Sequence, residues 1–155
     1  MEIKKDLYKK FESKLLLFQR SIRHHEVRWQ KISKMSLLET MLLRFIILEG
    51  PHKMKDVSNK FEIKLSTLTS VIDKLERNNL LLRKHTPHDR RVILLHPSVK
   101  GKKRFEEYRN FLWQSLNQLA TNFEEQQLSH FVEAIQSLHL SIAANFENQT
   151  IDTDS

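Results

Sequence analysis

Cysteine is absent from this chain of 155 residues, and glycine and proline are rare. Without a thiol the protein can form no disulfide, no thiolate zinc site and no thiol redox sensor. With only 2 glycines and 3 prolines, the chain also has few of the residues that interrupt helices. Leu, Lys, Glu and Gln, which favour helices, are abundant, so the composition predicts long helices.

Long hydrophobic runs are missing as well. The longest apolar stretch, from Leu37 to Leu48, is interrupted by Glu39 and Arg44 and is too short to span a bilayer. The N-terminal residues lead into no apolar segment of the kind that signal peptides contain. We therefore expect a cytoplasmic protein with no membrane partner.

Patterns that carry catalysis are also lacking. The sequence has no Gly-rich phosphate loop, no nucleophile elbow and no convincing carboxylate pair. The adjacent His24 and His25 would point in different directions on a helix, and no His-x-x-x-His pair accompanies them. We expect no catalytic residue, no metal site and no cofactor, and therefore not an enzyme.

Positive charge, in contrast, is abundant and unevenly placed. The formal net charge is +7 and the sequence pI is about 9.7. Residues 60–104 hold 12 Lys and Arg against 4 Asp and Glu, whereas residues 105–155 hold 1 against 8. This distribution indicates one dedicated basic face and a polyanionic partner.

Apolar spacing predicts the first two helices. Apolar residues recur at steps of three and four from Leu7 to Ile32, which is typical of one stripe on a long helix. Ser36 and Glu39 form the pattern of a capping box, so a second helix begins there. That helix is apolar nearly all round until Gly50 and should be buried.

The rest of the chain predicts a helix-turn-helix, a hairpin and two more helices. The predicted elements are a short helix before a turn at 62–64, a helix from about Leu65 to Asn78, strands at 80–84 and 92–95, a helix opening at 97–98, and a last helix after a second capping box at 121–124. The predicted fold class is mainly α with a small β-hairpin wing. Residues 36–104 would form a winged helix-turn-helix lobe, 1–35 and 105–147 a helical dimerisation region, and 148–155 a flexible tail.

The second helix of such a pair fits the major groove of DNA, where short polar or basic side chains can approach base edges and phosphates. Its outward residues here are Ser66, Thr67, Thr69, Ser70, Lys74 and Arg77. The hairpin tip carries Arg90 and Arg91, long cations suited to a phosphate or an adjacent minor groove. These residues are the predicted contacts with double-stranded DNA.

The stretch from Ser66 to Arg83, with Pro87–Arg91 and Ser98–Gly101, resembles the MarR (multiple antibiotic resistance regulator) family. The family pattern is a Ser-Thr-led recognition helix, Leu-Glu, a strand ending in Arg, an Asp-x-Arg wing and Thr-x-x-Gly. The resemblance covers about residues 53–104, and the flanking helices fit the family's dimerisation region in length and order.

By this resemblance Asp89 steadies Arg91 in the wing, and Lys64, where a capping Ser is common, adds a phosphate contact. The chain departs from the pattern at Glu62 and Asn79, where Gly is usual, and at Ser98, where Thr is usual. The resemblance implies a homodimeric, sequence-specific transcriptional regulator, a ligand-responsive repressor on pseudo-palindromic sites.

The resemblance also implies a small aromatic or carboxylate effector as a partner, because many relatives bind small phenolic or carboxylate ligands. The residues that could line its pocket are Phe18, His25, Trp29 and Trp113, and the alternative for them is core or dimer packing. Two other functions stay open: an architectural, non-specific DNA-binding protein, or a winged helix that binds a protein.

Overall fold

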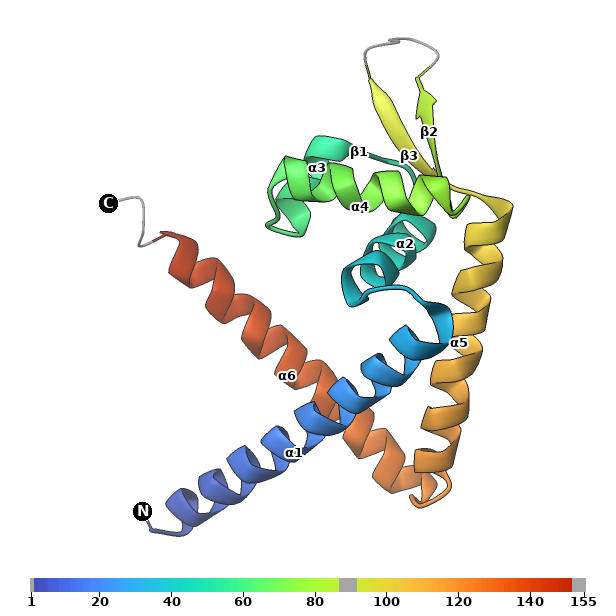
Figure 1. Ribbon diagram of the computed structural model, residues 1–155. Coiled ribbons are helices and arrows are strands. Elements are labelled where there is room, and N and C mark those ends of the chain that lie inside the picture. The colour runs from blue at the N-terminus through green and yellow to red at the C-terminus, as the bar shows by residue number, and fades with distance from the viewer. Residues whose placement is uncertain (1, 87–91, 152–155) are drawn as a thin grey trace. The chain divides into compact units, whose positions relative to one another are not determined.

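The computed structural model describes residues 2–86 and 92–151, which are mostly helical (Figure 1). The elements are α1 (Glu2–Ser33), α2 (Leu37–Glu49), β1 (His52–Lys53), α3 (Met54–Lys60), α4 (Leu65–Arg77), β2 (Leu81–His85), β3 (Ile93–Pro97), α5 (Val99–Ala120) and α6 (Glu125–Ile151). Contacts divide the chain into two compact units, Met1–Phe111 and Leu112–Ser155. The order of elements confirms the predicted fold class, a mainly helical protein with a small hairpin wing.

The start of α2 is fixed by the predicted capping box. The Glu39 backbone N–H donates to Ser36 Oγ at 3.2 Å, and the Ser36 N–H donates to Glu39 Oε2 at 2.6 Å. Further along, Leu42 and Ile46 are fully buried, but Leu48 is exposed. The expectation that α2 is buried nearly all round is thus wrong, since one side of the helix, with Met41, Arg44 and Leu48, is exposed.

The core of the first unit lies where α2, α3, α4 and the small sheet meet. Its fully buried members are Leu42, Ile46, Val57, Leu68, Ile72, Leu75, Leu81 and Leu95. Burial of such side chains stabilises by roughly 1.5–3 kcal/mol each relative to exposure, so this core holds the two helices of the helix-turn-helix in place.

Both helices of the pair end in the same backbone motif. After α3, the Ile63 N–H donates to Ser58 O and Glu62 adopts a positive φ of 51°. After α4, the Leu80 N–H donates to Leu75 O and Asn79 adopts a φ of 57°. These Schellman ends satisfy the last helical carbonyls, and they place non-glycine residues in the left-handed region that favours glycine.

The sheet has three antiparallel strands in the order β1-β3-β2. Arg83 of β2 pairs with Leu95 of β3, and Leu95 pairs on its other side with His52 of β1. The two hairpin strands were predicted with ends within two residues of the observed ones, but β1 was not predicted. A two-residue strand is too short to show an alternating pattern, and only its partner β3 makes it a strand.

The entry into α5 explains the Ser98-to-Gly101 pattern. Ser98 Oγ accepts a hydrogen bond from the Gly101 N–H at 2.8 Å and donates to Asn79 O. A Cβ atom on Gly101 would lie 2.0 Å from the carbonyl oxygen of Leu80. The glycine therefore allows the first turn of α5 to pack directly against the Leu80 backbone, between the recognition helix and β2.

The second unit contains the end of α5 and α6. The predicted capping box at residues 121–124 is wrong, since α6 begins at Glu125 and the Glu124 N–H donates to Gln127 Oε1 at 3.1 Å. The first turn is therefore capped three residues later than predicted. The backbone is helical from residue 148 to Ile151, where the sequence predicts the tail, because a helix continues through polar residues when no Gly or Pro interrupts it.

Across the described residues, no helix is long and apolar enough to cross a membrane.

Candidate nucleic-acid interface

The recognition helix α4 has one buried face and one polar face. Leu68, Ile72 and Leu75 are fully buried in the core, and α4 packs beside α3 and β2 (Figure 1). The predicted base-contacting residues Ser66, Thr67, Thr69 and Ser70 are all exposed. The structure therefore brings these four short side chains together on the solvent side of one helix.

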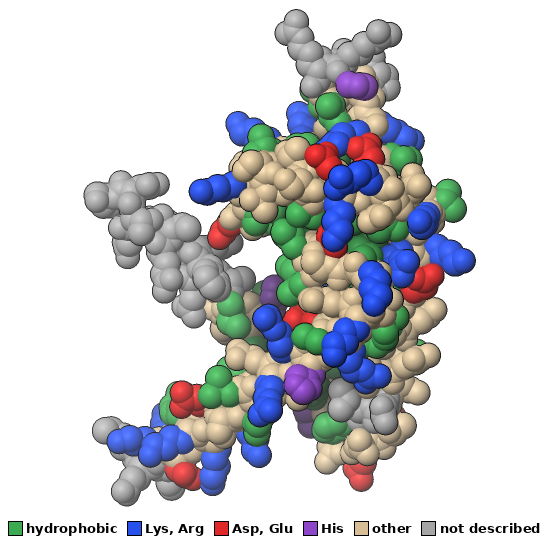
Figure 2. Space-filling model, viewed as in Figure 1, with side chains coloured by type: hydrophobic (Ala, Val, Ile, Leu, Met, Phe, Trp, Pro, Cys, Tyr) green, Lys and Arg blue, Asp and Glu red, His purple; other side chains and the backbone are tan. Residues whose placement is uncertain are grey.

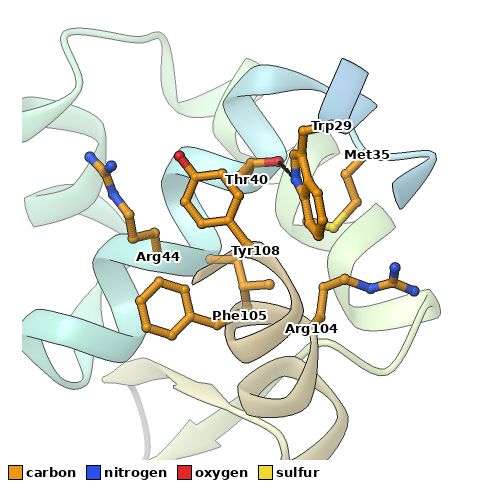
Figure 3. Close-up of a pocket in the computed structure, with 8 residues that line it drawn as sticks. Trp29, Met35, Thr40, Arg44, Arg104, Phe105 and Tyr108 are labelled. Atoms are coloured by element: carbon orange, nitrogen blue, oxygen red, sulfur yellow. Dashed lines mark hydrogen bonds between the residues drawn. The ribbon is translucent and has the colours of Figure 1, made fainter. Parts of the chain in front are cut away.

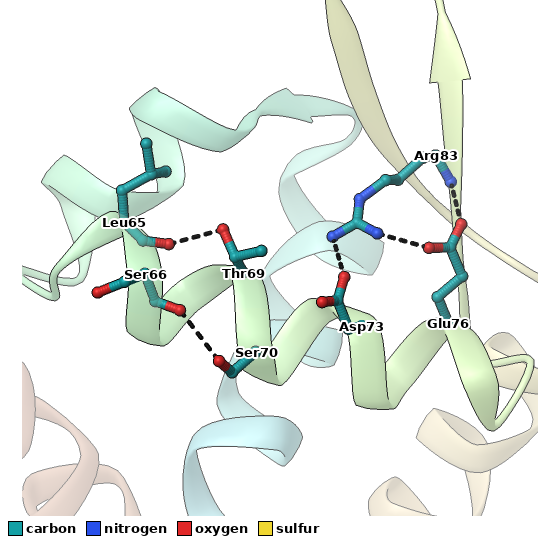
Figure 4. A network of polar contacts seen from close by, with 7 residues as sticks. All are labelled: Leu65, Ser66, Thr69, Ser70, Asp73, Glu76 and Arg83. Atoms are coloured by element: carbon teal, nitrogen blue, oxygen red, sulfur yellow. Dashed lines mark hydrogen bonds and ion pairs between the residues drawn. The ribbon is translucent and has the colours of Figure 1, made fainter.

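Two of these hydroxyls already donate to their own helix. Thr69 Oγ1 donates to Leu65 O at 2.8 Å and Ser70 Oγ donates to Ser66 O at 3.1 Å, as Figure 4 shows. Their hydrogens are used by the backbone, so the oxygens are left to accept hydrogen bonds. In a major groove the matching donors are the amino groups of adenine and cytosine.

The N-terminus of α4 is electropositive. Lys64 is its exposed N-cap residue, and the first turn contains no acidic residue. The unpaired N–H groups of a first turn carry the positive end of the helix dipole, and a lysine at the cap adds a full charge. This end of the helix is therefore suited to a phosphate group.

Arg83 of β2 neutralises the two acidic residues of α4. Its Nη2 lies 2.6 Å from Asp73 Oδ1 and its Nη1 lies 2.7 Å from Glu76 Oε2 (Figure 4). The Arg83 backbone N–H also donates to Glu76 Oε1 at 3.3 Å. The pairing fastens the helix to the wing strand and neutralises two carboxylates that lie on the same side of α4 as Thr69.

Sequence reasoning did not assign a role to Arg83. The available signal was the spacing of Asp73 and Glu76, which places two acids on one face of a helix that is expected to meet DNA. A distant cation to pair with them can be identified only once β2 is packed beside α4.

The predicted cations at the other end of α4 differ from each other. Lys74 Nζ lies 2.7 Å from Oε1 of Glu39, whose side chain is only 3% exposed. Arg77 is exposed, and within the described residues no ion pair is recorded for it. Arg77 is thus free to reach a phosphate, whereas Lys74 is held by the first turn of α2.

Glu39 is ionised despite its burial. Burial raises the pKa of this carboxyl, but the hydrogen bonds from Lys74 and Ser36 and the positive charge of Lys74 more than offset that effect. The pKa of Glu39 therefore lies below its usual value.

The predicted wing contacts Asp89, Arg90 and Arg91 lie outside the described residues. Figure 2 shows more Lys and Arg than Asp and Glu side chains on the visible face of the first unit. Lys84 and His85 lead up to the wing loop on β2, and the burial of His96 and the charge of Lys84 lower the pKa of His96. The face around α4 and the hairpin is accordingly basic.

A pocket lies between α1, α2 and the first part of α5, all in the first unit. Trp29, Thr40, Arg44 and Tyr108 line its narrow inner part (Figure 3) and also an adjoining cavity of about 150 Å³. Trp29 Nε1 donates to Thr40 Oγ1 at 3.2 Å, and the indole packs edge-on against Tyr108.

Two of the four predicted pocket residues line this cavity. Trp29 is buried at its wall, and His25 lies beside it against the ring of Phe111. Burial and the charge of Arg28 lower the pKa of His25, while Glu26 acts in the opposite direction, so the imidazole is neutral at neutral pH. Phe18 is half-exposed on α1, and Trp113 is exposed in the second unit.

Residues 35–93 of this chain match the MarR family. A Bacillus subtilis protein described as an uncharacterized HTH-type transcriptional regulator, YkoM, is 32% identical over 82 residues, which are 53% of each chain. The HTH-type transcriptional repressor MdtR of the same organism is 40% identical over 58 residues, 37% of each chain. The matched part thus spans about half, or less, of these relatives.

Solved structures extend the likeness of fold to most of the chain. A MarR family protein from Bacillus stearothermophilus has a TM-score of 0.82 at 20% identity, covering 90% of this chain and 97% of that one. Streptococcus pneumoniae FabT, solved in complex with DNA, has a TM-score of 0.74 at 20% identity, covering 88% and 98%. Residues 35–93 of this chain are thus similar to the MarR family, and the fold of most of the chain is similar to that of these solved structures.

Proposed function

We propose that the protein is a sequence-specific DNA-binding transcriptional repressor, not an enzyme, and that it acts as a homodimer on pseudo-palindromic duplexes. The observation that carries this proposal is the polar face of α4. Its exposed row of Ser and Thr is held up by a fully buried row of Leu and Ile, and its acids are neutralised by Arg83. A helix of this kind can enter a major groove without repelling the phosphates.

The contacts divide into two kinds. Ser66, Thr67, Thr69 and Ser70 approach base edges and supply specificity, whereas Lys64 and Arg77 contact phosphates at the two ends of the helix. Asp89, Arg90 and Arg91 would extend the contact to the minor groove or to phosphates from the wing, with Asp89 steadying Arg91. The name of the relative MdtR, a repressor, supports repression as the outcome of binding.

The dimer is supported by exposed apolar rows on two helices. On α1 the row comprises Leu7, Phe11, Leu15, Phe18 and Ile22, and on α6 it comprises Leu128, Phe131, Ile135, Leu138 and Ile142. Rows this long are rarely left in water, so we assign residues 1–35 and 105–147 to dimerisation. A two-fold dimer presents two recognition helices to two half-sites.

The cavity beside Trp29 is the proposed site for a small aromatic or carboxylate effector. Trp29 and Tyr108 offer aromatic faces, and Arg44 offers a cation that could pair with a carboxylate. Isothermal titration with salicylate and benzoate as probes tests this part. An Arg44→Met variant should weaken both, and binding that is unchanged in this variant would remove Arg44 from the site.

Selection of duplexes from a random pool tests the main proposal. The wild-type protein should enrich a pseudo-palindrome and bind it at least about a thousandfold more tightly than random DNA at fixed salt. Equal affinity for all duplexes would instead indicate the architectural function, and no binding at all would favour a protein partner.

A pair of serine variants then tests α4. Ser70→Glu should abolish binding, because it adds bulk and negative charge on the face that meets the DNA. Ser137→Glu places the same charge on α6, where the native hydroxyl likewise donates to its own helix. Because Ser137 lies within the residues assigned to dimerisation, sedimentation must show that this variant remains a dimer, and its affinity should then be unchanged. Equal effects of the two variants would contradict the assignment of α4.

A further inference from the structure

Glu39 is a buried carboxylate that connects α2 to the recognition helix. Its Oε2 accepts a hydrogen bond from the Ser36 N–H at 2.6 Å, and its Oε1 lies 2.7 Å from Lys74 Nζ. A buried carboxylate stays ionised only where cations and N–H groups stabilise it, so these contacts hold each other in place. Lys74 is consequently fastened at the point where α4 passes the first turn of α2.

The next residue in the chain belongs to the pocket. Thr40 Oγ1 accepts a hydrogen bond from Trp29 Nε1 at 3.2 Å and donates to Ser36 O at 3.1 Å. The Ser36 backbone is therefore hydrogen-bonded to both side chains: its N–H donates to Glu39, and its carbonyl oxygen accepts from Thr40. One helical turn joins the indole that lines the cavity to the carboxylate that holds α4, and all of these groups lie in the first unit.

We propose that Glu39 is a positioning residue that sets the recognition helix through Lys74 and passes changes at Trp29 and Thr40 to it. The inference rests on the proposed binding of DNA by α4. It also assigns Lys74 a different role from the one that the sequence predicts. The ammonium group serves the carboxylate inside the protein and does not contact a phosphate.

Removing the charge of Glu39 has opposite predicted effects on DNA affinity, depending on whether Glu39 positions α4. Glu39→Gln removes a negative charge next to the DNA face, which by simple electrostatics would strengthen binding. If Glu39 positions α4, the same variant weakens binding, because the Gln amide has a single acceptor oxygen and leaves either the Lys74 ammonium or the Ser36 N–H facing an NH2 donor. We expect a loss of about five- to tenfold for the selected duplex, equal at every salt concentration.

Glu62→Gln is the matched control. It removes the same charge from the turn before α4, where the side chain is exposed. We expect its affinity to stay within about twofold of the wild type. An affinity for Glu39→Gln that equals or exceeds that of Glu62→Gln would overturn the inference.

Variants of Lys74 separate positioning from phosphate contact. Lys74→Met should weaken binding without changing the slope of affinity against salt, and Lys74→Arg, which keeps a cation at Glu39, should restore it. The Glu39→Gln and Lys74→Met losses should not add in the double variant, since the two residues act as a pair. A slope that falls by about one in Lys74→Met would show a phosphate contact and overturn the inference.

Trp29 provides a readout that does not need DNA. In a Trp113→Phe background Trp29 is the single tryptophan. Its indole N–H donates a hydrogen bond to Thr40, the residue that follows Glu39 in the chain. Lys74→Met should shift the Trp29 emission while circular dichroism stays native, and Lys55→Met, an exposed lysine of α3, should not. An unchanged emission in Lys74→Met would overturn the coupling even if DNA binding failed, whereas failure of the wild type to bind any duplex would overturn the proposed function alone. Should Glu39→Gln not fold, Lys74→Met, whose native side chain is 49% exposed, tests the same pair.

Discussion

At the scale of single residues, three side chains occupy backbone positions that suit glycine better. Lys34, Glu62 and Asn79 have φ values of 59°, 51° and 57°. For residues with a Cβ atom this region costs roughly 1–2 kcal/mol, although Asn tolerates it better than most. Glu62 and Asn79 stand where the MarR family, which the sequence resembles, usually has Gly. Their positive φ values explain why glycine suits these two positions.

Replacing Glu62 by glycine should stabilise the protein. The gain from relieved strain exceeds the added entropy of the unfolded chain, so we expect about 0.5–1 kcal/mol in the free energy of unfolding. Urea denaturation measures it. Glu62→Ala is the control, because it removes the same side chain but keeps the strained Cβ, and a gain of equal size in that variant would show that strain is not the cause.

The ion pair of Glu39 makes stability depend on pH. The pKa of Glu39 is lowered in the folded protein, so the carboxylate contributes stability that is present above its unfolded pKa and is lost as pH falls through the folded pKa. In Lys74→Met the effect of burial is no longer offset by a cation. We expect a loss of about 1–3 kcal/mol in unfolding free energy at neutral pH. The loss should shrink as the pH falls and the carboxyl is protonated, first in the variant and then in the wild type.

Urea denaturation at several pH values measures this loss, with Lys55→Met as the control for removal of an exposed lysine. A loss that is the same at neutral and acidic pH would mean that the charge of Glu39 is not responsible.

At the scale of elements, two arginines near α4 should have separable effects. Arg83→Met leaves Asp73 and Glu76 without their cation, so we expect about 1–2 kcal/mol less stability and weaker DNA binding. Arg77→Met removes an exposed charge, so stability should change by less than about 0.5 kcal/mol, while the salt slope of DNA binding falls by about one.

Thermal denaturation and DNA titrations at several salt concentrations test both arginines. If Arg77→Met destabilises the protein as much as Arg83→Met, the assignment of Arg83 as the fastening between α4 and β2 does not hold.

At the scale of the whole molecule, the apolar rows on α1 and α6 predict a dimer at micromolar concentration. Ile135 of α6 is 44% exposed, so Ile135→Glu should leave the chain folded but weaken the dimer, which sedimentation velocity detects. Leu48→Glu introduces the same charge at an exposed leucine of α2 outside these rows and should remain dimeric. A wild-type protein that sediments as a folded monomer would refute the proposed assembly.

Features that depend on neighbours along the chain could be predicted from the sequence. Apolar steps of three and four defined α1 and α4, the Ser36 capping box defined the start of α2, and the face from Ser66 to Ser70 identified the recognition helix. These patterns are readable because residues three or four apart share a helix face. The capping box predicted at residues 121–124 was wrong because a local sequence pattern does not show at which of several polar residues the helix begins.

Contacts between distant segments depend on the tertiary packing and could not be predicted from local patterns. It paired Arg83 with Asp73 and Glu76, made a strand of His52–Lys53, and buried Glu39 beside Lys74. From the sequence Lys74 and Arg77 are equivalent cations on one helix. The packing of α2 against α4 pairs Lys74 with the buried carboxylate of Glu39 and leaves Arg77 exposed. Local spacing could not predict this difference, because Glu39 lies far from Lys74 in the sequence and only the fold brings them together.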